Sequence, residues 1–262
     1  MAFLERLNGD RIYYELIDGP ADRPVLVFLH EGLGCTAMWK AFPQQLCAAT
    51  GCAGLVYDRV GYGRSSPARQ PRTIHYLHEA SLQELPEVLE GTIPGREYIL
   101  TGHSDGGTIA LLYAAERPTG LRGVITEAAH VFVETGTREG LEAAVAAYRA
   151  GKLAGLARYH GEKTDTVFWS WAATWSAPWF RSWSIEYALP AIEVPVLVLQ
   201  GQDDQYGTPA QVAAIAGGRP ERRGVLVEGS GHAPHADQPE VLIRLMGEFI
   251  AGLQPGVMNV ET

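Results

Sequence analysis

Short, uninterrupted apolar runs alternate with segments of helical periodicity along most of this chain. The clearest runs are PVLVFLH at 24–30, CAGLVYD at 52–58 and VPVLVLQG at 194–201. A run without polar alternation is typical of a strand that is buried on both faces. Because such strands alternate with helices, the sequence predicts an α/β fold, with a mainly parallel, doubly wound sheet of about eight strands.

The remaining segments complete this pattern. EYILTGH at 97–103, LRGVITEAAH at 121–130 and RRGVLVEGSG at 222–231 read as further strands, and RIYYELI at 11–17 alternates like a half-buried one. Segment 74–91 predicts a helix interrupted by a proline, and 239–253 predicts an amphipathic closing helix. The last nine residues, 254–262, are expected to form a loose tail.

One segment, 133–192, contains no strand-like run and carries five of the six tryptophans. The sequence therefore predicts a core domain made of 1–132 and 193–262, with 133–192 as a helical, Trp-rich cap. Four of the tryptophans recur every fourth residue and either hold the cap to the core or face a ligand. An aromatic roof favours a substrate with an apolar or aromatic portion. The five tryptophans of segment 133–192 are Trp169, Trp171, Trp175, Trp179 and Trp183.

Charge and cysteine content limit the partners. The formal net charge of −9 argues against a nucleic-acid surface, and no apolar run is long enough for a membrane span. The start of the chain lacks the pattern of a secretory signal. Cys35, Cys47 and Cys52 are odd in number and lack metal-ligand spacing. We therefore expect a cytoplasmic protein that acts on a small molecule, with no membrane or nucleic-acid partner; a homodimer is one arrangement the sequence allows.

The sequence GHSDG at 102–106 has the G-x-S-x-G pattern of a nucleophile elbow. A predicted strand precedes it and a predicted helix follows it, which is the context this motif requires. In such a turn the serine backbone is strained and the hydroxyl stands at the helix N-terminus. The alternative interpretation is an ordinary glycine-rich turn between a strand and a helix. The context favours Ser104 as a nucleophile.

A serine hydroxyl needs a base, and the base needs an orienting carboxylate. The loops GQDDQYGTP and GSGHAPHADQP follow the last two predicted strands, at the same sheet edge as Ser104. His232 is the expected base, with His235 as the alternative and a purely structural histidine as a further one. The residues themselves leave the acid open between Asp203 and Asp204.

From about 12 to 253 the chain resembles the α/β-hydrolase superfamily. The resemblance rests on FLHEGLG, YDRVGYGRSSP, GHSDGG, GQDD and GSGHAPHADQPE. It implies an acid three residues after Gly201, which is Asp204, with Asp203 in a turn or supporting role. Some members of the superfamily place the acid after the preceding strand, which would point to Glu127.

The resemblance also implies an oxyanion hole made of two backbone N–H groups. One belongs to Asp105, and the other comes from the loop after strand 24–30. This chain has His30-Glu31-Gly32 where the family usually has H-G-x, so Gly32 falls at the donor position and Glu31 replaces a glycine. His30 is expected to pin this loop. The residues expected to contact substrate are Glu31, Leu33, His103, Trp171, Trp175 and Trp179.

Two further loop residues, Asp58 and Arg59, match a family loop that supports the site. Unless they are paired, Glu31 and Asp105 would disfavour a substrate carboxylate. Cations of the predicted cap could reverse this: Arg158, Lys163 and Arg181.

These features together predict a serine hydrolase that cleaves a carboxylic ester or lactone and needs no metal or organic cofactor. Serine in place of aspartate argues against the haloalkane dehalogenases and epoxide hydrolases of the superfamily. Three alternatives use the same triad: carbon–carbon bond cleavage, hydrolysis of an amide or N-terminal peptide bond, and peracid formation. A slow-turnover ligand-sensing protein is an alternative from another class.

Overall fold

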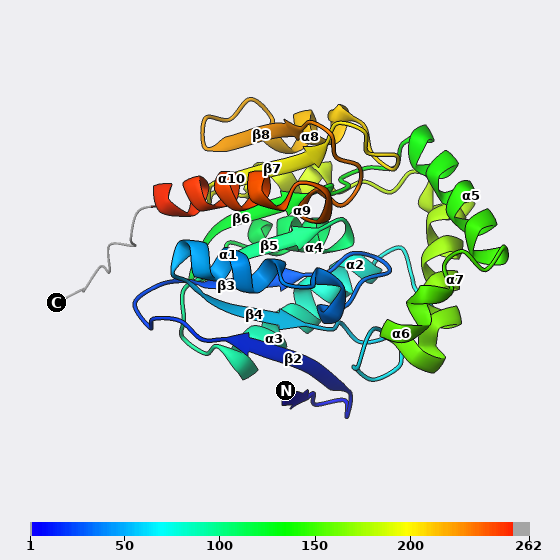
Figure 1. Ribbon diagram of the computed structural model, residues 1–262, viewed down its shortest axis with the longest axis horizontal. Coiled ribbons are helices and arrows are strands. Elements are labelled where there is room, and N and C mark those ends of the chain that lie inside the picture. Colours follow the sequence, from blue (N-terminus) through cyan, green and yellow to red (C-terminus); the bar gives the residue numbers. More distant parts are fainter. Residues whose placement is uncertain (1, 254–262) are drawn as a thin grey trace.

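The computed structural model describes residues 2–253, and its centre is a single eight-stranded sheet (Figure 1). The strand order is β1-β2-β4-β3-β5-β6-β7-β8, in which β2 pairs antiparallel with both β1 and β4 and all the other neighbours pair parallel. The predicted α/β fold is therefore confirmed. The strands are β1 Ala2–Glu5, β2 Arg11–Ile17, β3 Val25–Leu29, β4 Ala53–Tyr57, β5 Tyr98–His103, β6 Leu121–Glu127, β7 Val196–Gly201 and β8 Arg222–Val227.

The central strands are buried throughout because helices cover both faces of the sheet. Every residue of β3, β4, β5 and β7 is buried. At the edge, β1 alternates between half-buried and exposed residues. Its four residues, AFLE, are too few for a clear period-2 pattern, and the sequence analysis did not identify this strand.

Two helices pack on one face of the sheet and three on the other, in two separate hydrophobic clusters. Helices α1 and α10 belong to the first cluster, and α3, α4 and α8 to the second. Figure 1 shows α1 and α10 side by side in front of the sheet. Their bounds are α1 Phe42–Thr50, α3 Leu85–Thr92, α4 Asp105–Ala115, α8 Pro209–Ala216 and α10 Pro239–Gly252.

The predicted helix at 74–91 is divided into three parts. It begins as α2 (Tyr76–Glu79), continues as a π-helical turn (Ala80–Glu84), and ends as α3. Pro86 stands in the first turn of α3. Proline has no N–H to donate to the preceding turn, so a regular α-helix cannot continue through it, and the wider turn takes up the mismatch.

Segment 133–192 connects β6 to β7 and is helical in the structure. Its three α-helices gather at one end of the sheet, at the right in Figure 1. His160 of this segment fastens it to the core, because its Nε2 donates to the carbonyl of Leu33 at 2.9 Å and its Nδ1 accepts from the N–H of Gly63 at 3.0 Å. The helices are α5 Thr135–Arg149, α6 Ala157–His160 and α7 Thr164–Ser176.

The predicted tail at 254–262 lies outside the described residues. The thiols of Cys35, Cys47 and Cys52 are buried and free. Within the described part of the chain, no helix has the length and apolarity needed to cross a bilayer.

Candidate active site

Ser104 stands in a strained turn between β5 and α4. Its backbone has φ 52° and ψ −114°, and its N–H donates to the carbonyl of Glu127 at 2.8 Å. The flanking glycines are required by space. A Cβ on Gly102 would lie 2.3 Å from the carbonyl oxygen of Gly106, and one on Gly106 would lie 1.9 Å from that of Leu29. The turn is therefore as tight as the G-x-S-x-G pattern implies.

The structure brings Ser104, His232 and Asp204 into one chain of hydrogen bonds. Nε2 of His232 lies 3.1 Å from Oγ of Ser104, and Nδ1 lies 2.8 Å from Oδ1 of Asp204. An ionised carboxylate accepts only, so Nδ1 carries the proton and Nε2 is free to accept the serine proton. This is the arrangement in which an imidazole acts as general base.

Geometry distinguishes the two adjacent aspartates. The Asp204 side chain is fully buried at His232, whereas Asp203 is exposed and its N–H donates to the carbonyl of Ser230 at 2.9 Å. Burial would raise the pKa of Asp204, but the hydrogen bond and charge of His232 and the N–H of Tyr206 outweigh it and lower that pKa. Asp204 is therefore ionised at neutral pH.

A second histidine–carboxylate pair lies close to the first, because His235 follows His232 by three residues. Nδ1 of His235 is 2.9 Å from Oε2 of Glu127, which also accepts the backbone N–H of His235 at 3.1 Å. The ring of His235 packs against Trp39 and Phe42, with centroid distances of 4.6 and 5.5 Å. The side chains of the alternative base and the alternative acid thus contact each other rather than the hydroxyl of Ser104.

Buried histidines hold the loops around Ser104 and His232. His103 donates from Nε2 to the carbonyl of His232 at 2.7 Å, and His130 donates from Nε2 to the carbonyl of Tyr206 at 3.0 Å. Burial lowers the pKa of both histidines, so both rings are neutral at neutral pH. His103 therefore fixes the position of the His232 backbone and does not line the cavity at Ser104.

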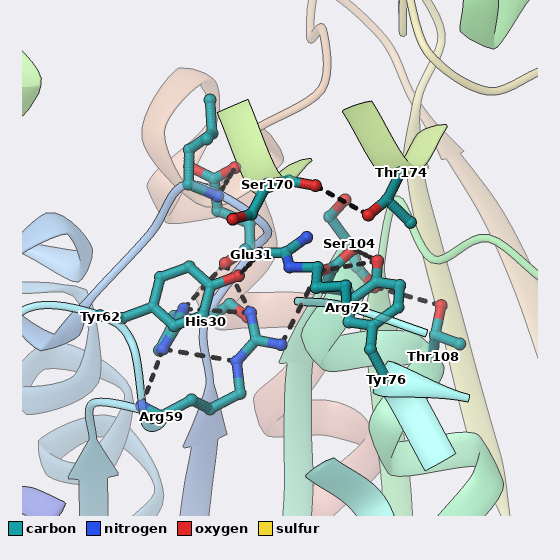
Figure 2. Close-up of polar contacts among 12 residues, drawn as sticks. His30, Glu31, Arg59, Tyr62, Arg72, Tyr76, Ser104, Thr108, Ser170 and Thr174 are labelled. Atoms are coloured by element: carbon teal, nitrogen blue, oxygen red, sulfur yellow. Dashed lines mark hydrogen bonds and ion pairs between the residues drawn. The ribbon is translucent and has the colours of Figure 1, made fainter. Parts of the chain in front are cut away.

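The loop after β3 is held by His30 and Arg59 (Figure 2). His30 donates from Nδ1 to the carbonyl of Glu31 at 2.8 Å and accepts the N–H of Arg59 on Nε2 at 3.1 Å. Arg59 also donates from Nη2 to the Glu31 carbonyl at 2.8 Å. His30 thus pins this loop, and the Arg59 loop supports it.

Gly32 belongs to this loop and lies next to Trp171 of α7 and to the start of α4. A Cβ on Gly32 would lie 2.7 Å from Cδ1 of Trp171 and 3.2 Å from Oδ2 of Asp105. The two expected oxyanion donors, Gly32 and Asp105, are therefore neighbours. The N–H of Asp105 has no partner within its own helix because it is the first residue of α4.

The carboxylate of Asp105 is neutralised by its neighbours. Nη1 of Arg59 lies 3.7 Å from Oδ2, and the hydroxyl of Tyr76 lies 3.2 Å from both oxygens. Nε1 of Trp175 donates to the Tyr76 hydroxyl at 3.1 Å, which links the roof to the helix N-terminus. Asp105 is therefore paired, which was one of the two cases that the sequence left open.

A small cavity of about 50 Å³ opens above Ser104. Of the six residues expected to contact substrate, Glu31, Leu33, Trp171 and Trp175 line it. Trp179 is 47% exposed on the cap and His103 lies below the His232 loop, so the structure does not place these two at the cavity. The sequence analysis did not identify four other lining residues, which are His130, Thr137, Leu141 and Tyr206.

Two of the missed residues carry a signal in the sequence. His130 is the last residue of the predicted strand 121–130, Tyr206 stands in the loop after the predicted strand 194–201, both lie at the same sheet edge as Ser104, and Tyr206 comes two residues after Asp204. Thr137 and Leu141 belong to α5 of the cap, where nothing in the sequence indicates which helix face turns inward. Among the described residues, no group of three or more His, Cys, Asp or Glu side chains is arranged to hold a metal ion.

The fold and this site define the class. Residues 26–245 match the model of the Alpha/beta hydrolase family, and the chain belongs to that family. The predicted resemblance is therefore confirmed.

Among curated proteins, the chain is 33% identical over 121 residues to a proline iminopeptidase of Saccharolobus solfataricus, covering 46% of this chain and 38% of that protein. It is 34% identical over 107 residues to the mouse sn-1-specific diacylglycerol lipase ABHD11, covering 40% and 32%. The match thus spans well under half the length of these relatives. A proline iminopeptidase of Lactobacillus delbrueckii subsp. bulgaricus is 22% identical, over 91% of this chain and 93% of that protein.

Among solved structures, the enol-lactonase of Burkholderia xenovorans LB400 superposes with a TM-score of 0.74 at 20% identity, over 95% of this chain and 100% of that chain. A thermophilic esterase of Thermogutta terrifontis superposes with a TM-score of 0.71 at 22% identity, over 96% and 98%. At this level of identity the likeness concerns the fold.

Proposed function

We propose that this protein is a serine hydrolase that cleaves a carboxylic ester or lactone with an apolar or aromatic portion. The observation that carries the proposal is the chain of hydrogen bonds from Asp204 through His232 to Oγ of Ser104, at 2.8 and 3.1 Å. A hydroxyl with a base so placed is an activated nucleophile. The aromatic residues Trp171 and Trp175 at the cavity support the apolar or aromatic portion.

In the proposed mechanism Ser104 attacks the carbonyl carbon while His232 takes the hydroxyl proton. His232 then gives that proton to the leaving alcohol, and later activates water to release the acyl group. Asp204 holds the ring in the Nδ1–H tautomer and stabilises its protonated form. The N–H groups of Gly32 and Asp105 bind the oxyanion of the tetrahedral intermediate.

A fluorophosphonate probe tests the nucleophile directly. Intact-mass analysis should show one adduct per wild-type chain, peptide mapping should place it on Ser104, and Ser104→Ala should give none. The same variant should lose p-nitrophenyl ester turnover by about 10⁴-fold or more. Equal turnover by wild type and Ser104→Ala would remove Ser104 from the mechanism.

A second candidate function is hydrolysis of an amide or N-terminal peptide bond by the same triad. Its support is the likeness to proteins named proline iminopeptidase. Parallel assays with p-nitrophenyl esters, lactones and amino-acid p-nitroanilides should distinguish the two: the main proposal predicts a larger kcat/KM for the ester or lactone.

A further inference from the structure

Four carboxylates surround Ser104 and His232, and three of them have a partner. Asp204 pairs with His232 at 2.8 Å, Glu127 with His235 at 2.9 Å, and Asp105 with Arg59 at 3.7 Å. The fourth is Glu31. Its carboxylate accepts one long hydrogen bond, from the N–H of Leu33 at 3.4 Å. Within residues 2–253, no lysine or arginine lies at ion-pair distance from it.

Glu31 lines the same cavity as Ser104 and His232. Among the other polar groups of that cavity, the pKa of His130 is lowered by burial, and Thr137 and Tyr206 carry hydroxyls, so His232 is the one lining group that can become positive near Glu31. Three aromatic residues complete the lining: Trp171, Trp175 and Tyr206. The cavity therefore combines one acidic side chain with electron-rich rings.

The cations of the cap do not compensate Glu31. Lys163 donates to the carbonyl of Tyr62 at 3.0 Å, and it does not line the cavity. Arg158 and Arg181 are exposed. The sequence analysis left open that these three could favour an anionic substrate, and the structure places all of them elsewhere.

We propose that Glu31, with the rings of Trp171, Trp175 and Tyr206, forms a subsite for a protonated amine on the substrate, close to the carbonyl that Ser104 attacks. The proposal rests on the function proposed above and names its substrate class: esters, or amides, that carry an ammonium group near the scissile bond. An ammonium group would give Glu31 the ion-pair partner that it lacks, and aromatic faces attract cations.

The sequence position of Glu31 fits this role. It replaces the glycine that usually follows the histidine of this loop, so the acidic side chain is a feature of this chain rather than of the general pattern. Burial raises the pKa of Glu31. A bound ammonium group favours the ionised carboxylate, so binding and ionisation support each other.

Glu31 could instead act on His232, by stabilising the imidazolium that forms during attack. That role would change kcat for every substrate alike. An amine subsite changes affinity for amine-bearing ligands alone. The two roles are therefore distinguished by comparing matched ligands that do and do not carry the charge.

Binding is measured on the Ser104→Ala protein, so that turnover plays no part. The ligands are alaninamide and isobutyramide, which differ only by ammonium in place of methyl. By isothermal titration calorimetry at neutral pH, alaninamide should bind at least about tenfold more tightly. Equal affinities, or no saturable binding of alaninamide, would overturn the subsite.

The variant Ser104→Ala/Glu31→Gln keeps the side-chain shape and removes the charge. It should lose the preference for alaninamide while its affinity for isobutyramide changes less than about twofold. The matched control is Ser104→Ala/Asp203→Asn, which neutralises an exposed acid on a neighbouring loop and should keep the preference. A preference that survives Glu31→Gln in a folded protein, judged by circular dichroism, contradicts the assignment. If Glu31→Gln does not fold, the ligand pair on Ser104→Ala alone decides.

The failure of each proposal has a different signature. Ester turnover that depends on Ser104, together with equal affinities for the two amides, overturns the amine subsite alone. A clear preference for alaninamide in a protein whose turnover does not depend on Ser104 overturns the proposed function alone.

Discussion

Two histidine–carboxylate pairs lie close together, with histidines three residues apart in the sequence, and they differ in what surrounds the second ring nitrogen. In His232–Asp204 that nitrogen faces Ser104 at 3.1 Å. In His235–Glu127 the ring is enclosed by Trp39, Phe42 and His103. A histidine paired with a carboxylate is thus a candidate base in one environment, and in the other its ring packs against aromatic side chains. Position relative to the nucleophile, not the pairing itself, makes the difference.

The largest contrast is expected from removing each ring. His232→Ala should lower kcat for p-nitrophenyl ester hydrolysis by about 10⁴- to 10⁶-fold, because Ser104 loses its base. His235→Ala should stay within about tenfold of wild type but lose about 1–3 kcal/mol of unfolding free energy. Steady-state kinetics and urea unfolding check both. An equal loss of kcat in a folded His235→Ala protein would break the comparison.

A smaller contrast is expected from the two carboxylates. Asp204→Asn should lower kcat by about 10⁴-fold, because an amide favours the wrong tautomer of His232. Glu127→Gln should change kcat by less than about tenfold and lower the unfolding free energy by about 1–3 kcal/mol, because Glu127 is fully buried against His235. Circular dichroism serves as the folding control for both variants. If Glu127→Gln proved the more damaging to kcat, Glu127 rather than Asp204 would be the acid of the triad.

The smallest effect is a pH dependence of the second pair. Burial alone would lower the pKa of His235, but the charge and hydrogen bond of Glu127 outweigh it and raise the pKa above its ordinary 6.5. The folded protein therefore binds a proton that the unfolded chain releases near pH 6.5. This contribution is fully present below that pH and is lost as the pH rises through the raised pKa.

Urea unfolding of wild type and Glu127→Gln across this range measures it. The difference in unfolding free energy between them should be largest on the acidic side and shrink as the pH rises. A difference that grows with pH would show that His235 is neutral in the folded protein.

Much of the site could be predicted because it lies directly after strands. Ser104 and Asp204 follow the buried strands β5 and β7, His232 follows the edge strand β8, and the carboxyl ends of parallel strands meet at one sheet edge. Asp203 and Asp204 could not be separated by the residues alone, since neighbouring side chains in a turn point in different directions. The structure separates them by burial and by the contact with His232.

The orientation of side chains in segment 133–192 was harder to predict from the sequence. Trp171, Trp175 and Trp179 were expected to contact substrate, but a constant spacing of four residues could not show which rings face the cavity, because that depends on how the helices of segment 133–192 sit on the core. The structure places Trp171 and Trp175 at the cavity, buries Trp183 and leaves Trp179 exposed. Such placement follows from contacts far apart in the sequence, such as that between Trp171 and Gly32.

The cavity above Ser104, at about 50 Å³, is far smaller than the roughly 300 Å³ or more of most ligand pockets. We therefore expect a sizeable acyl group to displace the indole rings of Trp171 and Trp175, which line the cavity, before it reacts, and its product to do so again on leaving. For bulky substrates this rearrangement, rather than bond breaking, would then be the rate-limiting step of turnover. Their kcat would slow in a viscous solvent, while that of the smallest substrates would not.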